Sequence, residues 1–176
     1  MSIVSDIEKL KKEKNAVILA HYYVDEDVQD VADYIGDSFY LSKVATKVSQ
    51  DRIIFAGVEF MGESAKIINP KKRVFMPDMN ADCPMAHMAD KDEILALREK
   101  YDDLAVVCYI NSTAELKKYS DVCVTSSNAV KIVKNLPNKN IFFIPDRNLG
   151  SYVAKQCPDK NLSLIHISEP TRPISI

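Results

Sequence analysis

Short apolar runs alternate along this chain with segments whose apolar positions follow helical spacing. Ile3, Ile7 and Leu10 fall on one helical face and predict a first helix over about residues 2–13. The pattern then predicts, in order, a strand at 16–20, a helix at 27–35, a strand-like segment at 39–41, a helix at 41–48, a strand at 52–57, a helix at 62–68 and a strand at 73–76. Strands alternating with short helices are typical of α/β units on a parallel sheet.

The second half of the chain repeats the first at a fixed offset of 88 residues. The matched positions are 17–20 with 105–108, Ser38 with Ser126, Phe55 with Phe143, Gly62 with Gly150, and Pro70 with Pro158. Registered positions of this kind indicate a duplicated unit. We therefore expect an α/β fold of two pseudo-repeated three-layer α/β/α modules with short parallel sheets. The expected boundaries are 1–84 for the first module, 85–162 for an incomplete second module, and 163–176 for an unmatched tail.

Composition and charge narrow the class of protein. The 176 residues are 47% hydrophobic and 27% charged, which favours a packed core over disorder. The net charge is −2, and no basic patch stands out, which argues against nucleic acid or an anionic membrane as the main partner. The apolar runs are far shorter than the roughly 20 residues of a membrane span, and the first residues lack the apolar core of a signal peptide. We expect a cytoplasmic protein.

Polar side chains gather just after the predicted strands. In parallel α/β sheets, ligands bind outside the carboxyl ends of the strands. The segments at these ends are HYY (21–23), VEFM (58–61), DMNADC (78–83), YINST (109–113), TSSN (125–128) and PDRN (145–148). Hydroxyl, amide, imidazole and guanidinium groups of this kind can bind carboxylates and phosphates. A simpler interpretation remains open, in which Ser38, Ser112 and Ser126 are ordinary helix N-caps and His21 is structural.

The four cysteines differ in their surroundings. Cys108 and Cys123 lie in apolar runs and are expected to be small buried hydrophobic residues, and Cys157 lies close to the end of a short predicted helix. Cys83 instead lies between Asp82 and Pro84 in a polar segment, which favours a loop with a chemical role.

The chain resembles the quinolinate synthase (NadA) family over about residues 7–162. The resemblance is carried by the segments ILAHYYVDEDVQDVADYIGDS, GVEFMGESAKIINPKKRV, DCPMA, YINSTAELK, TSSNAV and PDRNLGSYVA. It implies a fragment of a three-domain, pseudo-threefold enzyme in which each domain gives one cysteine to a [4Fe–4S] cluster. The implied reaction condenses iminoaspartate with dihydroxyacetone phosphate to quinolinate in NAD biosynthesis, with the cluster as Lewis acid. It also implies small-molecule substrates and a transient handover from L-aspartate oxidase.

The same resemblance implies roles for individual residues. Cys83 would be the first cluster ligand. His21 and Ser38 would bind substrate carboxylate or phosphate, and His21 is also placed among the catalytic residues. Tyr23 and Tyr109 would transfer protons or hold the intermediate. Asn111 and Ser126 would complete the anion site, whereas Arg147 and His87 have less definite roles.

The resemblance ends abruptly near Leu162. The repeat places the second cluster ligand at position 171, which is Thr171, and Cys157 is not an equivalent substitute. The segment LSLIHISEPTRP resembles translated sequencing-adapter sequence, so we expect an artefactual tail that packs poorly. The alternative is a genuine divergent end, and by pattern alone residues 162–165 could still complete the last strand. A chain with one such thiolate cannot hold a cluster that needs three or four, and this chain is expected to be inactive by itself.

Two other classes of function remain open at this point. One is a metal-free α/β binding module for a small phosphorylated or dicarboxylic ligand, with Cys83 as an incidental thiol. The other is a cysteine hydrolase that uses Cys83 and His87, whose i, i+4 spacing places both on one face if the segment is helical.

Overall fold

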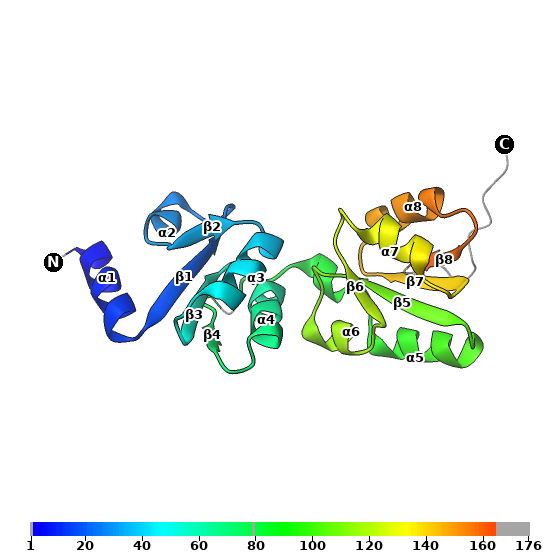
Figure 1. Ribbon diagram of the computed structural model, residues 1–176, viewed down its shortest axis with the longest axis horizontal. Helices are drawn as coiled ribbons and strands as arrows, with labels where there is room; N and C mark the ends of the chain where they lie inside the picture. Colours follow the sequence, from blue (N-terminus) through cyan, green and yellow to red (C-terminus); the bar gives the residue numbers. More distant parts are fainter. Residues whose placement is uncertain (1, 79, 165–176) are drawn as a thin grey trace. The chain divides into compact units, whose positions relative to one another are not determined.

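The computed structural model describes residues 2–78 and 80–164. The chain divides into two compact units, Met1–Cys83 and Pro84–Ile176. Each unit contains one four-stranded sheet whose paired strands are all parallel, and helices connect the strands (Figure 1). The α/β class with two short parallel sheets, predicted from the alternating pattern, is confirmed.

The first unit begins with a helix and ends with the last strand of its sheet. Its elements are α1 (Ile3–Glu13), β1 (Ala16–His21), α2 (Glu26–Asp30), β2 (Tyr34–Gly36), α3 (Ser38–Lys47), β3 (Arg52–Ala56), α4 (Glu59–Ile68) and β4 (Arg73–Phe75). The strands lie in the order β2-β1-β3-β4. The central strand β1 is buried almost throughout, whereas the edge strand β2 is largely exposed.

The second unit has the same order of elements after a short 3₁₀ turn. Its elements are η1 (Pro84–His87), α5 (Lys91–Lys100), β5 (Leu104–Tyr109), α6 (Ala114–Lys118), β6 (Val122–Val124), α7 (Ala129–Asn135), β7 (Asn140–Ile144), α8 (Arg147–Gln156) and β8 (Asn161–Leu164). The strands lie in the order β6-β5-β7-β8, which is the order of the first sheet.

The two units repeat each other residue by residue. β1 begins at Ala16 and β5 at Leu104, 88 residues later, and both strands have six residues. The same offset relates β2 to β6, β3 to β7, α2 to α6 and α4 to α8. It also preserves strand register, since Leu19 pairs with Tyr34 in one sheet and Val107 pairs with Val122 in the other. The predicted duplication is therefore confirmed in both topology and register.

The second unit has three layers. On one face of its sheet, Val107 and Phe143 pack against Val133 of α7 and Val153 of α8. On the other face, a second cluster joins the sheet to Ile94 of α5 and Leu116 of α6. In β5 and β7, alternate residues supply the two clusters, as the period of a strand requires. Each face is buried because the strands are short, apolar and covered by helices on both sides.

The α1 side of the first unit is packed less completely. Helices α1 and α2 have no fully buried residue, whereas Ile94 of α5 is fully buried. A cavity of about 370 Å³ remains beside Ile7, Ile54 and Phe75. At the position equivalent to Ile54, the second unit has the larger Phe142, which is fully buried.

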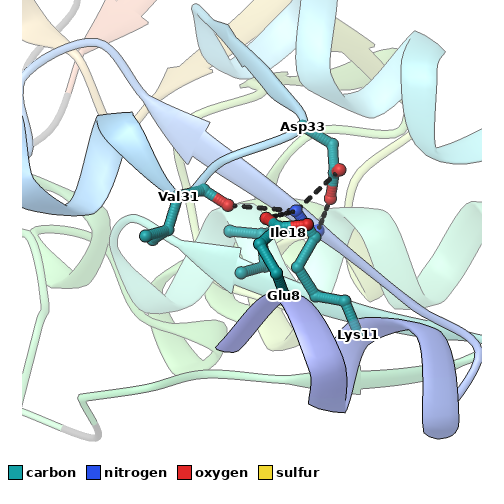
Figure 2. Close-up of polar contacts among 5 residues, drawn as sticks. All are labelled: Glu8, Lys11, Ile18, Val31 and Asp33. Carbon is teal, nitrogen blue, oxygen red and sulfur yellow. Dashed lines mark hydrogen bonds and ion pairs between the residues drawn. The ribbon is translucent and has the colours of Figure 1, made fainter. Parts of the chain in front are cut away.

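A buried polar contact fastens α1 to the first sheet (Figure 2). Lys11 Nζ lies 2.8 Å from Asp33 Oδ1 and donates to the Val31 carbonyl at 3.2 Å, while Asp33 Oδ2 accepts from the Ile18 backbone N–H at 2.8 Å. Burial disfavours the Lys11 ammonium, but its bonds to Asp33 and Glu8 outweigh that cost, so the pKa of Lys11 is raised. The carboxylate therefore ties a helix, a loop and the central strand together.

The second unit builds the same contact with a different cation. Arg98 donates to Asp121 Oδ2 at 2.9 Å and to the Tyr119 carbonyl at 3.1 Å. Asp121 Oδ2 also accepts from the Val106 backbone N–H at 2.7 Å. Asp33 and Asp121 are 88 residues apart, as are Ile18 and Val106, so the duplication extends to this hydrogen-bond network.

Asp33→Ala and Asp121→Ala are expected to destabilise the chain by similar amounts. Each removes an acceptor from a buried strand N–H and one partner of a cation. We expect each to lower the free energy of unfolding by about 1–2 kcal/mol, since both carboxylates are partly exposed. Urea unfolding followed by circular dichroism measures the loss, with the exposed Asp30→Ala as control. A loss in only one variant, or an equal loss for the control, would contradict the shared role.

The structure corrects the predicted elements between residues 27 and 48. The helix predicted over 27–35 ends at Asp30, and Tyr34–Gly36 forms strand β2 instead. The segment 39–41, predicted as strand-like, lies inside helix α3. The Asp37 side chain accepts from the Tyr40 N–H at 2.7 Å and fixes the start of α3. Phe39 and Tyr40 therefore lie in the first turn of this helix rather than in a strand.

The structure also differs from two sequence predictions about the second sheet. Cys123 was expected to be buried, but it is exposed because β6 is an edge strand. Strand β8 includes Ser163 and Leu164, which the sequence assigned to the tail, and Leu164 is buried. The rest of the predicted tail, 165–176, lies outside the described residues, so its packing stays a prediction.

No helix among the described residues combines the length and the apolar character that a membrane crossing requires.

Candidate functional site

The candidate residues follow the carboxyl ends of the parallel strands. In the first unit, His21 ends β1, Tyr23 follows it, and Ser38 follows β2. In the second unit, Tyr109 ends β5 and Asn111 follows it. Because parallel strands end at the same edge of a sheet, each unit presents its own candidates along one edge.

His21 is the buried imidazole at the edge of the first sheet. Its side chain is only 6% exposed, and its ring centroid lies 3.9 Å from that of Tyr23. Nδ1 accepts from the Tyr23 backbone N–H at 3.4 Å, an orientation that leaves the proton of the neutral ring on Nε2. Burial lowers the pKa of His21, and the Asp37 carboxylate partly offsets this. At neutral pH His21 is therefore a neutral N–H donor.

Tyr23 and Cys83 interact electrostatically within the first unit. The Cys83 loop is held to the start of α4, where the Glu59 N–H donates to the Ala81 carbonyl at 2.9 Å. Burial raises the pKa of Tyr23, a hydrogen bond from the Val58 backbone opposes the rise, and the charge of Cys83 adds to it. Cys83 itself is a half-buried free thiol, and its N–H donates to Asp82 Oδ1 at 2.7 Å. A phenol and a thiol thus share this edge.

The three serines are not N-caps, which corrects the simpler interpretation of the sequence. Asp37, Thr113 and Asn128 hold the N-cap positions of α3, α6 and α7. Ser38 is the first residue of α3, Ser112 is fully buried, and Ser126 is exposed between β6 and α7. Ser38 and Ser126 therefore remain candidates for binding an anion, whereas Ser112 has a structural role: its hydroxyl donates to the Tyr109 carbonyl at 2.9 Å.

Tyr109 and Asn111 form the corresponding polar group in the second unit. Asn111 Nδ2 donates to Tyr109 Oη at 3.1 Å. Burial raises the pKa of Tyr109, the Asp146 carboxylate adds to the rise, and the hydrogen bond from Asn111 opposes it. The phenol consequently stays protonated at neutral pH.

The loop before α7 is fixed by its own side chains. Asn128 Oδ1 accepts from the Thr125 N–H at 2.7 Å, and the Thr125 and Ser127 hydroxyls lie 2.9 Å apart. Ser126 lies between these residues and is exposed. Arg147 opens α8 after the cap Asp146 and is also exposed, so it can contribute charge at the same strand edge.

The candidates of the two units occupy equivalent positions. At an offset of 88 residues, His21 corresponds to Tyr109, Tyr23 to Asn111, and Ser38 to Ser126. The duplicated backbone therefore carries different chemistry at matched sites: an imidazole and a phenol in one unit, and a phenol and an amide in the other.

The low pKa of His21 gives a pH prediction. We expect its imidazole to titrate below 6.5 in the folded chain and lower still in Asp37→Asn, which keeps a capping side chain but removes the charge. Because the unfolded state then binds the proton more readily, acidification below pH 6.5 should reduce the stability of the first unit. Histidine chemical shifts followed by NMR measure both values. A pKa at or above 6.5, or a rise in Asp37→Asn, would contradict this environment.

Comparison with known proteins assigns the family. The family model described as "NadA: Quinolinate synthetase A protein" matches residues 5–168, which is most of the chain. The chain belongs to the NadA family. The match extends six residues past Leu162, where the resemblance seen in the sequence ends.

Curated relatives agree with this assignment. The chain is 66% identical over 158 residues to quinolinate synthase of Fusobacterium nucleatum, covering 90% of the chain and 53% of that protein. It is 54% identical over 162 residues to quinolinate synthase of Caldicellulosiruptor saccharolyticus, covering 92% of the chain and 54% of the relative. Quinolinate synthase of Clostridioides difficile is 54% identical over 155 residues, covering 88% of the chain and 51% of that relative. The chain thus spans about half the length of the NadA proteins that it matches.

The structure adds two carboxylates to the candidate site and argues against the cysteine-hydrolase hypothesis. Asp37 and Asp146 influence His21 and Tyr109, yet sequence analysis gave Asp37 no role and considered Asp146 only as a partner that lets Arg147 brace the fold. Asp146 lies two residues after β7, a usable signal, whereas the strand before Asp37 was not predicted. The cysteine-hydrolase hypothesis required Cys83 on a helix, but η1 begins at Pro84, after the cysteine.

The described cysteines do not make up the ligand set of a [4Fe–4S] cluster. Cys108 and Cys157 are buried in the second unit, and Cys123 lies on an edge strand of that unit. Cys83 alone combines partial exposure with a loop at the strand ends. It fits one cluster ligand, and the other thiolates would have to come from outside the described residues.

Proposed function

We propose that the whole protein is a quinolinate synthase of NAD biosynthesis. It condenses iminoaspartate with dihydroxyacetone phosphate and releases phosphate and water as quinolinate forms. The observation that carries this proposal is the 66% identity with a quinolinate synthase over nearly the entire chain. Since the chain covers about half of that relative, the proposed activity belongs to the complete protein, and residues 1–176 alone are inactive.

The strand-edge donors of both units support binding of the anionic substrates. His21 offers a neutral Nε2–H, and Ser38 lies at the start of the ten-residue helix α3, where backbone N–H groups favour an anion. Asn111 and Ser126 provide amide and hydroxyl donors at the edge of the second sheet. We propose that these four residues bind the carboxylates and the phosphate.

The two tyrosines support a role in proton transfer. Burial raises the pKa of both Tyr23 and Tyr109, so both phenols are protonated near pH 7 and act first as acids. Asn111 donates to Tyr109 Oη and fixes the oxygen while the phenolic proton stays available to a substrate oxygen. We propose Tyr23, Tyr109 and His21 as the residues that transfer or hold protons.

Cys83 is the residue whose location argues for a [4Fe–4S] cluster as the cofactor. Its position on a half-exposed loop suits one ligand of a [4Fe–4S] cluster whose remaining ligands lie in the rest of the protein. When bound, such a cluster supplies a Lewis acid for dehydration. Iminoaspartate is unstable, which favours a transient handover from L-aspartate oxidase. The alternative, a metal-free module for a phosphorylated or dicarboxylic ligand, retains the same donors but gives no role to Cys83.

An assay of a complete protein tests the proposal. Residues 1–164 of this chain, which keep β8 whole, are joined to the remaining sequence of the Fusobacterium nucleatum relative. We refer to this protein as the chimera. Under anaerobic conditions, with L-aspartate oxidase supplying iminoaspartate, we expect it to form quinolinate and phosphate in equal amounts. A folded chimera that contains iron but forms no quinolinate, beside an active relative, would overturn the proposal.

A further inference from the structure

Two cysteines of the second unit lie side by side on neighbouring strands. Cys108 of β5 and Cys123 of β6 are register partners in the parallel sheet. Neighbouring strands lie about 4.8 Å apart, and directly paired residues point to the same face. This separation is within the range of Cα distances, roughly 4.4–6.8 Å, that a disulfide spans.

The side chains of this pair lie on the same face of the sheet, and their thiols interact electrostatically. Cys108 Sγ lies 2.8 Å from Ser112 Oγ and donates to the Tyr109 carbonyl at 3.4 Å. The register therefore places the two sulfurs side by side on neighbouring strands.

The two thiols differ in access and in acidity. Cys123 is exposed on the edge strand, whereas Cys108 is fully buried. The adjacent Cys108 thiol lowers the pKa of Cys123 to about 7 against the effect of burial, and the Lys117 ammonium adds to the lowering. The adjacent Cys123 and burial raise the pKa of Cys108. Cys123 is therefore the accessible thiolate, and Cys108 is the protonated partner behind it.

We propose that Cys108 and Cys123 form a peroxide-reactive dithiol that closes to an intramolecular disulfide. The Cys123 thiolate attacks one oxygen of hydrogen peroxide, the O–O bond breaks, and a sulfenic acid and water form after proton uptake. The Cys108 sulfur then attacks the Cys123 sulfur, the S–O bond breaks, and the departing hydroxide takes up the Cys108 proton to become the second water. Two thiols are oxidised by two electrons, and one peroxide is reduced to two waters.

The first unit has apolar residues at the positions equivalent to the two cysteines. The residues equivalent to Cys108 and Cys123 are Ala20 and Ile35, which are register partners in the first sheet. Ala20 is fully buried and Ile35 is 43% exposed, so the fold accepts apolar side chains at both places. A dithiol is therefore not required by packing, and alanine at position 108 is compatible with the fold.

Peptide mapping tests the proposal on the 176-residue chain. The reduced chain is treated with a small molar excess of hydrogen peroxide, alkylated and digested with trypsin without reduction. Cleavage at Lys117 and Lys118 separates the two cysteines into peptides 101–117 and 119–131. We expect these peptides to be joined, with a mass two hydrogens below their sum, and dithiothreitol to release them. The product should remain a monomer on a non-reducing gel.

Substitution of each cysteine in turn tests the separate roles of Cys123 and Cys108. In Cys108→Ala, we expect Cys123 to stop at the sulfenic acid, which dimedone traps, and in Cys123→Ser we expect peroxide consumption to slow at least about tenfold. Far-UV circular dichroism checks that both variants fold. Cys123 alkylated or over-oxidised with no linked peptide in the wild-type chain, or a disulfide that joins Cys83 instead, would overturn the proposal.

Discussion

Cys83→Ala is expected to eliminate both the iron–sulfur cluster and quinolinate formation in the chimera. Cys83 is the described cysteine that lies on a half-exposed loop after the last strand of the first unit. Loss of one thiolate from a set of three protein ligands leaves a cluster that does not persist. Iron and acid-labile sulfide should fall to background in anaerobically purified protein, and turnover should fall below detection.

Other cysteines provide the controls for this experiment. Cys157→Ala removes a fully buried thiol of the second unit's core and is expected to cost about 1 kcal/mol of stability without loss of iron. Cys108→Ala should behave in the same way. Full iron content and full turnover in Cys83→Ala would remove Cys83 from the proposed site. Equal loss of iron in Cys157→Ala would indicate a folding defect instead.

Tyr109→Phe is expected to reduce kcat of the chimera by about 10²–10⁴-fold while leaving its iron content unchanged. The phenol is protonated at neutral pH, lies at the end of β5, and receives a hydrogen bond from Asn111 at 3.1 Å. Phenylalanine keeps the ring and its packing but removes the proton that we assign to the reaction. A loss that appears in kcat rather than in KM separates proton transfer from substrate binding.

A second tyrosine serves as the matched control for Tyr109. Tyr119 caps the end of α6 through its backbone and packs at the edge of the core cluster on the other face of the same sheet. Tyr119→Phe should keep kcat within about twofold, since no role in the site is assigned to its hydroxyl. Unchanged kcat in Tyr109→Phe, or a similar fall in Tyr119→Phe, would contradict the assignment.

The central strands were predictable from sequence because their burial leaves a clear signal. β1, β3, β5 and β7 are short apolar runs, and the match of Phe55 with Phe143 gave the offset of the repeat. The edge strand β2 was missed because it has three residues, of which Tyr34 and Ile35 are exposed. An exposed edge produces no apolar run, and the start of α3 depends on a single capping carboxylate at Asp37.

The site was predictable only as far as topology determines it. Parallel strands place His21, Tyr23 and Ser38 along one edge, a consequence of sequence order alone. The effect of Asp146 on Tyr109 depends on tertiary distances that the spacing of residues does not give. The contact between Cys108 and Cys123 likewise required the register of β5 and β6. For the same reason, sequence analysis treated both cysteines as ordinary core residues.

Iron-edge anomalous diffraction from anaerobic crystals of the chimera is the most direct test of the assignment of Cys83. We predict a cluster of iron atoms bonded to Cys83 Sγ, in the unit whose strand edge carries His21 and Tyr23. Iron bound elsewhere with Cys83 as a free thiol, or an active chimera without iron, would contradict both the cofactor and the ligand that we propose.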